Sequence, residues 1–161
     1  IQENTISKFA SIEDKYVRGL LISRESVAKE RKIDFVLTQE SFLEENHGII
    51  DSNDIVTILG NLIENAFEAC SLCGDIKKRV EVSLYEDESV IEIQVRDNGR
   101  NIDEKIRNTL FLEGISSKGD GRGTGLYLVK NRVEIYNGSI DIEEFDDEKI
   151  FVITILKGVD K

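Results

Sequence analysis

Four side chains that carry oxygen atoms lie along one side of a helix that the sequence predicts over residues 58–72. Asn61 and Asn65 are four residues apart, and Glu64 and Glu68 follow the same side. Amide and carboxylate oxygens are hard ligands that suit Mg²⁺, which takes one or two of them and completes its shell with water and phosphate. The helix is therefore a candidate Mg²⁺ site, although such a row alone is more typical of the solvated face of an amphipathic helix.

An Asp-Asn-Gly sequence ends a predicted strand over residues 90–97. Asp97 is a candidate buried acceptor for an exocyclic amine, and Gly99 would let a ligand approach the backbone. By itself this sequence is more typical of an ordinary turn after a strand. Its interpretation therefore depends on the motifs around it.

A glycine-rich stretch, Gly119-Asp-Gly-Arg-Gly-Thr-Gly-Leu, opens a predicted helix over residues 124–136. Backbone N–H groups in such a turn at a helix N-terminus form a site for anions. The spacing matches neither the P-loop nor the dinucleotide-binding pattern that follows a strand. Contact with phosphate is favoured here over a flexible loop with a glycine cap.

A helix with Mg²⁺ ligands, an Asp acceptor and a phosphate cradle are together the parts of a nucleotide site. They also resemble, in order and spacing, the motifs of sensor histidine kinases. Asn61-Leu-Ile-Glu-Asn-Ala is similar to the N box, Asp97-Asn-Gly-Arg-Asn-Ile to the G1 box, Gly121-Arg-Gly-Thr-Gly-Leu to the G2 box and Phe111 to a remnant of the F box. Asn61-Leu-Ile-Glu-Asn-Ala-Phe-Glu-Ala and Ala28-Lys-Glu-Arg-Lys-Ile also resemble the citrate/dicarboxylate-sensing subfamily.

The resemblance implies an ATP site with Mg²⁺ in the Bergerat-type fold of type II DNA gyrases and mismatch-repair ATPases. It implies that Asn61 and Asn65 face Mg²⁺ and the phosphates, that Asp97 accepts from the adenine amine, and that residues 111–122 form a mobile lid over ATP. The other nucleotide contacts that it implies are Glu68, Gly99, Ile102, Lys118, Gly121, Arg122, Gly123, Thr124, Gly125 and Leu126, of which Lys118 and Arg122 would meet phosphate charge.

The residue at position 61 separates two activities of this superfamily. Its hydrolases carry a Glu that activates water where Asn61 stands, and an amide cannot take a proton. The sequence therefore favours a kinase over a fast hydrolase, with Asn61, Glu64 and Asn65 as the candidate catalytic residues. Glu64 is the only local candidate base, and it keeps open the alternative of a serine protein kinase of anti-sigma type.

Two features depart from the family pattern. Family members carry Gly where Asn101 stands, and Asn is the residue other than Gly that best tolerates positive φ. Asn101 in place of Gly is the one sequence feature that favours the alternative of a non-catalytic phosphotransfer or scaffold module. The only histidine, His47, lies beside Gly48 in a polar stretch and is expected to be an exposed loop residue. The phosphoacceptor histidine is therefore expected upstream of this chain.

The predicted elements give an α+β fold, a two-layer sandwich in which helices cover one face of a mixed sheet. A long helix over residues 5–31 precedes it, so we expect residues 1–32 to end a dimerisation hairpin and residues 33–161 to form the ATP-binding domain. The further predictions are strands over 33–38, 79–85, 90–97, 139–145 and 149–156, helices over 54–72, 103–110 and 124–136, and loops over 39–52 and 111–123.

Composition excludes several classes of protein. The 161 residues include 21 basic and 32 acidic ones, which argues against nucleic-acid and membrane-surface binding. No apolar run approaches the length of a membrane span, and Cys70 and Cys73 are interpreted as a packed and an incidental residue rather than a redox pair. The resemblance to sensor histidine kinases implies the cytoplasmic part of a membrane-anchored kinase whose partners are ATP, a response regulator and, through the dimerisation helices, a second copy.

Overall fold

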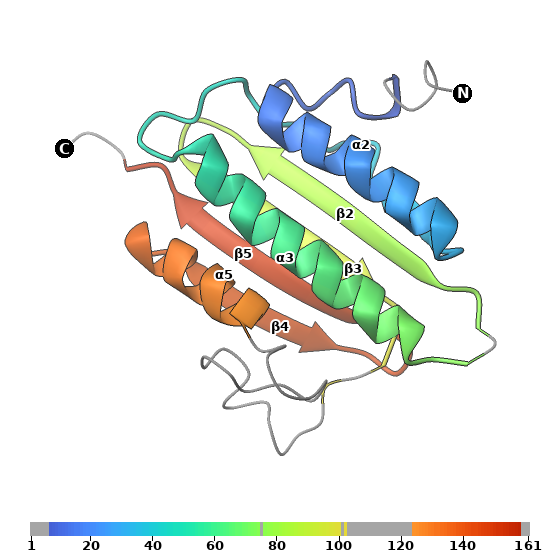
Figure 1. Cartoon of the computed structure of the whole chain (residues 1–161). Coiled ribbons are helices and arrows are strands. Elements are labelled where there is room, and N and C mark those ends of the chain that lie inside the picture. The colour runs from blue at the N-terminus through green and yellow to red at the C-terminus, as the bar shows by residue number, and fades with distance from the viewer. Residues whose placement is uncertain (1–6, 75, 101, 103–123, 159–161) are drawn as a thin grey trace.

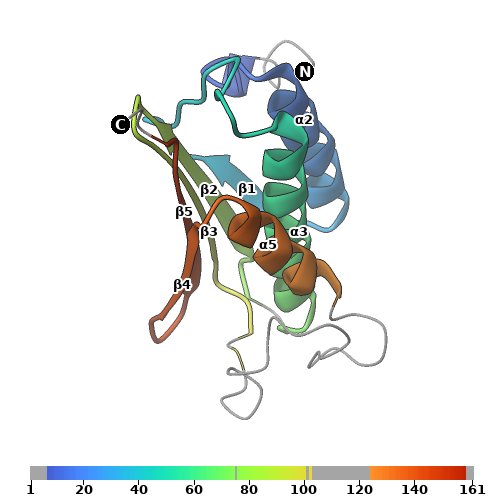
Figure 2. The same cartoon turned by 90° about the vertical axis from the view of Figure 1, so that its left-hand side faces the viewer.

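The computed structural model describes residues 7–74, 76–100, 102 and 124–158. Within them, three helices cover one face of a five-stranded sheet (Figures 1 and 2). The strand order is β1-β2-β3-β5-β4, and only the β1–β2 pair is parallel. This confirms the predicted two-layer α/β sandwich. The elements are α2 (Lys15–Glu30), β1 (Asp34–Leu37), α3 (Ser52–Ser71), β2 (Arg79–Glu86), β3 (Val90–Asp97), α5 (Thr124–Ile135), β4 (Ser139–Glu144) and β5 (Lys149–Leu156).

The inner face of the sheet is apolar in its middle and charged at both ends. Alternate residues of β2, β3 and β5 point toward the helices and are buried, among them Leu84, Ile93 and Ile153. At one end the same alternation turns Asp97 and Lys149 inward, and at the other end it turns Glu86 and Lys157 inward. Each end of the inner face therefore carries a lysine–carboxylate pair.

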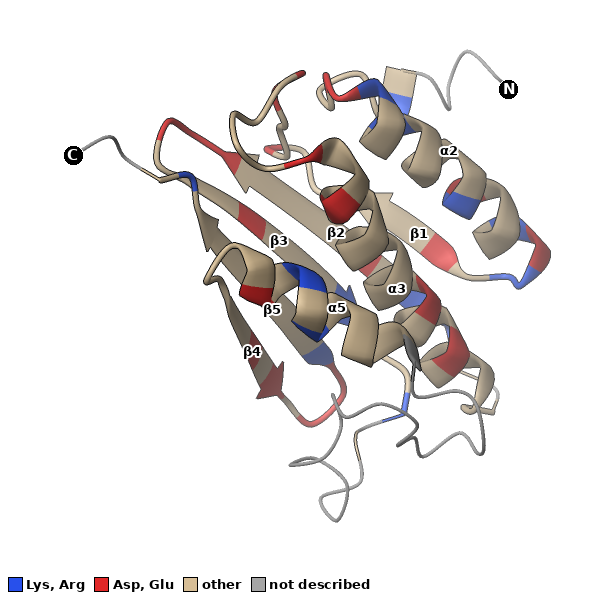
Figure 3. Cartoon of the chain, turned by 60° about the vertical axis from the view of Figure 1, so that its left-hand side comes forward, with Lys and Arg blue, Asp and Glu red and all other residues tan. Residues whose placement is uncertain are grey.

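Helix α3 is the central helix of the layer and lies between α2 and α5 (Figure 1). The Asp51 side chain caps its N-terminus by accepting the Asn53 N–H at 2.8 Å. Toward α5, Asp54 Oδ1 lies 3.1 Å from Arg132 Nε, where Figure 3 shows acidic positions on α3 and basic positions on α5. The helix thus begins and ends within two residues of its prediction, and it packs against a helix on each side.

The predicted helix over residues 5–31 is wrong over residues 9–14, since α2 begins only at Lys15; residues 5 and 6 lie outside the described residues. Asp14 is the N-cap, and its Oδ1 accepts the N–H groups of Tyr16 and Val17 at 2.9 and 3.1 Å. Before it, Ile12 forms a parallel bridge with Leu43 and is fully buried. The apolar spacing of this segment fits a continuous helix, but residues 7–11 form only a short helical turn, closed by hydrogen bonds from the Ala10 and Ile12 N–H groups to the Ser7 and Phe9 carbonyls, before the bridge at Ile12.

Helix α2 packs on the sheet and on α3 of the same chain. Its residues Val17, Leu21 and Ala28 are fully buried and belong to the same apolar core as α3 and the sheet. The assignment of residues 1–32 to a dimerisation hairpin stays a prediction. No helix in the described part of the chain is long and apolar enough to cross a membrane.

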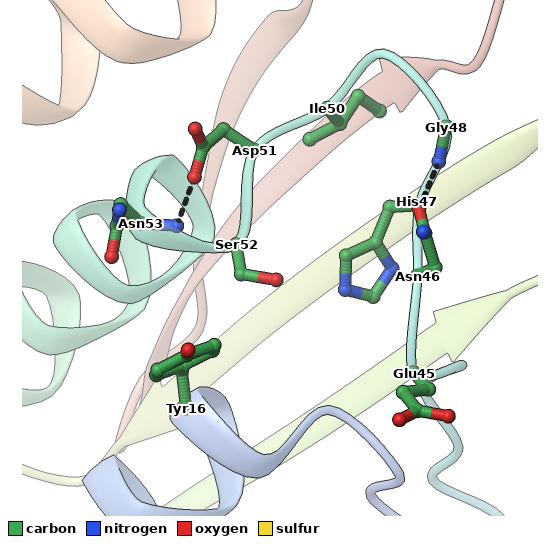
Figure 4. A pocket seen from close by; sticks show the side chains of 9 residues that line it. All are labelled: Tyr16, Glu45, Asn46, His47, Gly48, Ile50, Asp51, Ser52 and Asn53. Atoms are coloured by element: carbon green, nitrogen blue, oxygen red, sulfur yellow. Dashed lines mark hydrogen bonds between the residues drawn. The ribbon is translucent and has the colours of Figure 1, made fainter.

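His47 is buried, so the prediction of an exposed loop residue is wrong. Its side chain is 1% exposed, with Nε2 2.6 Å from Asp14 Oδ2 and Nδ1 2.8 Å from Glu86 Oε1. Figure 4 shows the imidazole on the inner side of its loop, facing Ser52, whose hydroxyl donates to Asp14 at 2.6 Å. The loop crosses the charged end of the sheet, and the ring fills the space between two buried carboxylates.

Candidate nucleotide site

Asn61 lies on α3 with its amide fixed in direction. Its Nδ2 donates to the Thr57 carbonyl at 2.7 Å, one helical turn earlier. A Cβ added at Gly125 would come within 3.0 Å of Asn61 Oδ1. The amide oxygen therefore faces the first turn of α5, and two residues predicted to act in one site lie against each other.

The four oxygen-bearing residues predicted to line one side of α3 do not all face the same neighbouring helix. Glu64 Oε2 lies 3.2 Å from Arg31 Nη1 at the end of α2, and both side chains are exposed. Helices α2 and α5 flank α3 on opposite sides (Figure 1), so Glu64 is paired on the side away from the Asn61–Gly125 contact. Asn65 and Glu68 are half-buried on the same helix. Asn61 therefore lies beside Gly125, and Glu64 pairs with Arg31, the residue that follows α2.

Asp97 ends β3 and is 1% exposed. Its Oδ1 accepts from Lys149 Nζ at 2.9 Å and from the Gly99 N–H at 2.9 Å. Lys149, 2% exposed, stands directly opposite in the β3–β5 register and also donates to the Arg100 carbonyl at 2.7 Å. The carboxylate is thus buried, held from two sides and placed at the sheet end that lies beside the C-terminal end of α3.

Gly99 is required by the helix that packs above it. A Cβ there would lie 2.5 Å from the carbonyl carbon of Ala69 and 2.6 Å from the Cys70 nitrogen. The next residue, Arg100, donates its N–H to the Ala69 carbonyl at 3.1 Å. The glycine was predicted to admit a ligand, and the structure adds a reason that the sequence did not suggest: the turn packs directly on the backbone of α3.

Two residues that hold this turn in place, Asn98 within it and Lys149 on β5, were not predicted. Asn98 accepts the Arg79 N–H at 2.8 Å and donates to the Lys77 carbonyl at 2.7 Å, which ties the turn to the start of β2. Lys149 was missed although the alternation of β5 turns it inward among Phe151 and Ile153. A lysine at an inward strand position is the signal that would have found it, since lysine is almost never fully buried unless paired.

Cys70 lies on α3 beside this turn and confirms its interpretation as a packed residue. It is fully buried, and Cys73 is half-buried; neither forms a disulfide. Burial, followed by the negative charge of Asp97, raises the pKa of the Cys70 thiol to about 11. The thiol is therefore protonated at neutral pH and is a poor nucleophile.

The glycine-rich stretch is described only from the start of α5. Gly125 is half-buried, Leu126 is buried, and Ile102 packs against the core from the other side of the gap. Thr124 is the first residue of the helix. The remaining predictions lie outside the described residues: Asn101, the helix over 103–110, the lid over 111–122, Phe111, Lys118, Gly121, Arg122 and Gly123.

The described side chains limit which metal ion this part of the chain could bind. Among them, no group of three or more His, Cys, Asp or Glu residues could hold a metal ion. A site that depends on soft or purely carboxylate ligands is therefore not formed by this part of the chain. The Asn61 amide oxygen, held in direction and facing the start of α5, fits Mg²⁺, which needs few protein oxygens when phosphate and water complete its shell.

Comparison with known proteins agrees with this geometry. Residues 50–158 match the family described as histidine kinase-, DNA gyrase B-, and HSP90-like ATPases. The chain is 37% identical over 134 residues to a probable C4-dicarboxylate sensor kinase of Halalkalibacterium halodurans, covering 82% of this chain and 25% of that protein. It is 31% identical over 134 residues to the sensor histidine kinase CitA of Klebsiella pneumoniae, covering 83% of this chain and 24% of that protein.

The fold also matches a solved structure. The catalytic domain of histidine kinase ThkA, in a nucleotide-free form, superposes with a TM-score of 0.72 at 23% identity, covering 89% of this chain and 91% of that one. The fold and the site define an ATP-binding domain. The chain belongs to the family of histidine kinase-, DNA gyrase B- and HSP90-like ATPases. Its relatives named above confirm the predicted resemblance to sensor histidine kinases, including the dicarboxylate and citrate sensors, and do not support the serine-kinase or non-catalytic alternatives. The chain spans about a quarter of the length of these relatives.

Proposed function

We propose that this chain is the ATP-binding catalytic part of a sensor histidine kinase. It transfers the γ-phosphoryl group of ATP to a histidine on a dimerisation domain, from which the group passes to a response regulator. The observation that carries the proposal is the placement of two residues around α3. Asp97 is buried at the end of β3, beside the C-terminal end of α3, and Asn61 on α3 faces the start of α5. A base acceptor and a phosphate-side amide are thereby presented by one helix and its neighbours.

Asp97 is the residue that reads the base. Its Oδ1 is engaged by Lys149 and Gly99, and its Oδ2 is also buried. A carboxylate accepts hydrogen bonds and does not donate them, so it favours the exocyclic amine of adenine over the carbonyl that guanine carries at the same position. Burial strengthens this selection because a wrong partner would leave a desolvated charge without its hydrogen bond.

The phosphates lie toward the start of α5. Asn61 and Asn65 would hold Mg²⁺ through their amide oxygens, and the ion would supply neutralisation of phosphate charge when bound. The backbone N–H groups of Gly121, Gly123 and Gly125 would meet the phosphate oxygens at the N-terminus of the helix. Other members of the proposed nucleotide site are Glu68, Ile102, Lys118, Arg122, Thr124 and Leu126.

The chemistry of the site favours transfer to a protein histidine over hydrolysis. Phosphoryl transfer needs positioning and charge stabilisation more than covalent participation of the protein. Asn61 cannot accept a proton from water, and Glu64 is paired with Arg31 on the side of α3 away from α5. His47 is no acceptor for an external phosphoryl group, because both of its nitrogens contact buried carboxylates. We therefore propose an acceptor histidine on another domain. As part of the same proposal, the parent protein is membrane-anchored and dimeric.

Calorimetric titration with a non-hydrolysable ATP analogue, with and without Mg²⁺, tests the proposal. We expect micromolar binding that depends on Mg²⁺ and is lost in the Asp97→Asn variant. Phosphorylation of a dimerisation domain supplied in trans then tests the kinase step, and the phosphate should be labile to acid, as phosphohistidine is. Absence of binding at millimolar analogue would refute the proposal for this chain.

A further inference from the structure

The ion pair between Lys149 and Asp97 is fully buried within the sheet–helix interface. Their side chains are 2% and 1% exposed, and Nζ lies 2.9 Å from Oδ1. Removing two charges from water is costly, and an apolar pair of similar size commonly holds such a place at least as well. Stability alone therefore does not account for a lysine and an aspartate in these two positions.

Among the described residues, Lys149 donates two hydrogen bonds to the segment that carries the base-reading residue. One N–H of its ammonium group binds Asp97 Oδ1, and another binds the carbonyl of Arg100, three residues further on. The Gly99 N–H meets the same Oδ1 atom from the backbone. Two donors on one oxygen fix the rotation of the carboxylate, and the bond to Arg100 fixes the turn that follows it.

We propose that Lys149 is a positioning residue that orients Asp97 toward the exocyclic amine of the bound base and offsets the cost of burying its charge. The inference rests on the proposed function of Asp97 and deepens it. Because Oδ1 is held, the ligand meets an acceptor already in its bound orientation, which reduces the ordering cost of binding. Lys149 thus contributes to selection of adenine without touching the nucleotide.

Lys157, just beyond the other end of β5, is a matched control because it also points to the inner face of the sheet. Lys157, which follows β5, pairs with Glu86 at 2.7 Å at the opposite end of the sheet, and its side chain is 13% exposed. Both lysines pair with an inward carboxylate of the sheet. Only Lys149 pairs with the residue proposed to read the base, so loss of a lysine as such can be separated from loss of its effect on Asp97.

The test measures the Kd of two ligands with Mg²⁺: ATP and purine riboside triphosphate, which lacks the exocyclic amine. Wild-type protein should bind ATP about 10- to 100-fold more tightly than the ligand without the amine. This factor corresponds to the free energy of one hydrogen bond to a charged group. Lys149→Met should weaken ATP binding by about tenfold or more and change the Kd of the amine-less ligand by less than about twofold. Lys157→Met should leave the ratio of the two Kd values as in wild type.

Each outcome separates this inference from the proposed function. If wild-type protein binds neither triphosphate, the nucleotide site itself is refuted. If ATP and the amine-less ligand bind equally to wild type, or if Lys149→Met weakens both equally or changes neither, the positioning role is refuted while ATP binding stands. Thermal melts check that each variant is folded. If Lys149→Met does not fold, Lys149→Gln replaces it, because glutamine keeps a donor for the carboxylate but no charge. It should reduce the preference for ATP over the amine-less ligand by a smaller factor than Lys149→Met.

Discussion

Nε2 of His47 lies 2.6 Å from Oδ2 of Asp14, the residue that caps α2. Through its other nitrogen the same ring contacts Glu86 at the end of β2. One side chain therefore joins the start of the N-terminal helix to the sheet. Lys157, the residue after β5, completes the cluster by pairing with Glu86 at 2.7 Å.

Replacing His47 by Ala should destabilise the domain strongly. The change leaves the buried carboxylates of Asp14 and Glu86 without their shared partner, and breaking a buried ion pair from one side costs about 3–5 kcal/mol. Urea denaturation followed by circular dichroism measures the loss. Ser52→Ala removes only a hydroxyl donor to Asp14 and should cost about 1 kcal/mol. A loss below about 1 kcal/mol for His47→Ala would show that the cluster does not hold these elements together.

The same cluster predicts how stability depends on pH. Burial alone would lower the pKa of His47, but the hydrogen bonds and charges of Glu86 and Asp14 outweigh it and raise the pKa above the ordinary 6.5. For Asp14 and Glu86 burial acts in the opposite direction and would raise the pKa. Their hydrogen bonds, including those with His47, outweigh burial and lower the two pKa values below the ordinary 3.8 and 4.5.

The sign for each group follows from these directions. The His47 contribution is fully present below pH 6.5 and is lost as the pH rises through the raised folded-state pKa. The carboxylate contributions are present above pH 4.5 and are lost as the pH falls through the lowered values. The cluster should therefore stabilise the fold most between pH 4.5 and 6.5. Unfolding free energies measured from pH 4 to 9 should fall on the alkaline side in wild type and not in His47→Gln; equal profiles would contradict this assignment.

The strands and α3 were predictable because local patterns specify them. Alternation of apolar residues marks β2, β3 and β5, and the caps and glycine bracket α3 to within two residues. The N-terminal helix was predicted too long because Phe9 and Ile12 have helical spacing whether or not the chain is helical there. The burial that explains them comes from contact with the core, including the bridge from Ile12 to Leu43.

The partners of buried charges could not be predicted in the same way. His47 meets carboxylates 33 and 39 residues away along the chain, and no local pattern brings them together. Lys149 meets Asp97 because β3 and β5 pair in one particular register. The motifs themselves, Asn61 and Gly125 among them, were identifiable from spacing, but their contact depends on how α5 packs against α3.

Substitution of Gly99 by Ala should destabilise the domain. The new Cβ would lie 2.5 Å from the Ala69 carbonyl carbon, and this neighbour is helix backbone that cannot rotate away. Overpacking of this kind costs about 1–3 kcal/mol. Gly19→Ala on α2 is the control, since nothing lies within 4 Å of its new Cβ, and it should stabilise the domain by about 0.5–1 kcal/mol. Denaturant midpoints measure both, and equal midpoints for Gly99→Ala and wild type would mean that the turn moves freely from α3.

Gly125→Ala should change stability and nucleotide affinity in opposite directions. Alanine is favoured over glycine within a helix by about 1 kcal/mol, which stabilises α5. Its Cβ, however, would come within 3.0 Å of Asn61 Oδ1, so the amide proposed to face Mg²⁺ and the phosphates must shift. We expect a higher thermal midpoint together with a Kd for the ATP analogue raised about tenfold, as for loss of one well-placed polar contact. Gly60→Ala on α3, whose Cβ would meet only Leu20 at 3.5 Å and more distant atoms, should leave the Kd unchanged. An unchanged affinity in Gly125→Ala would place Asn61 outside the phosphate end of the site.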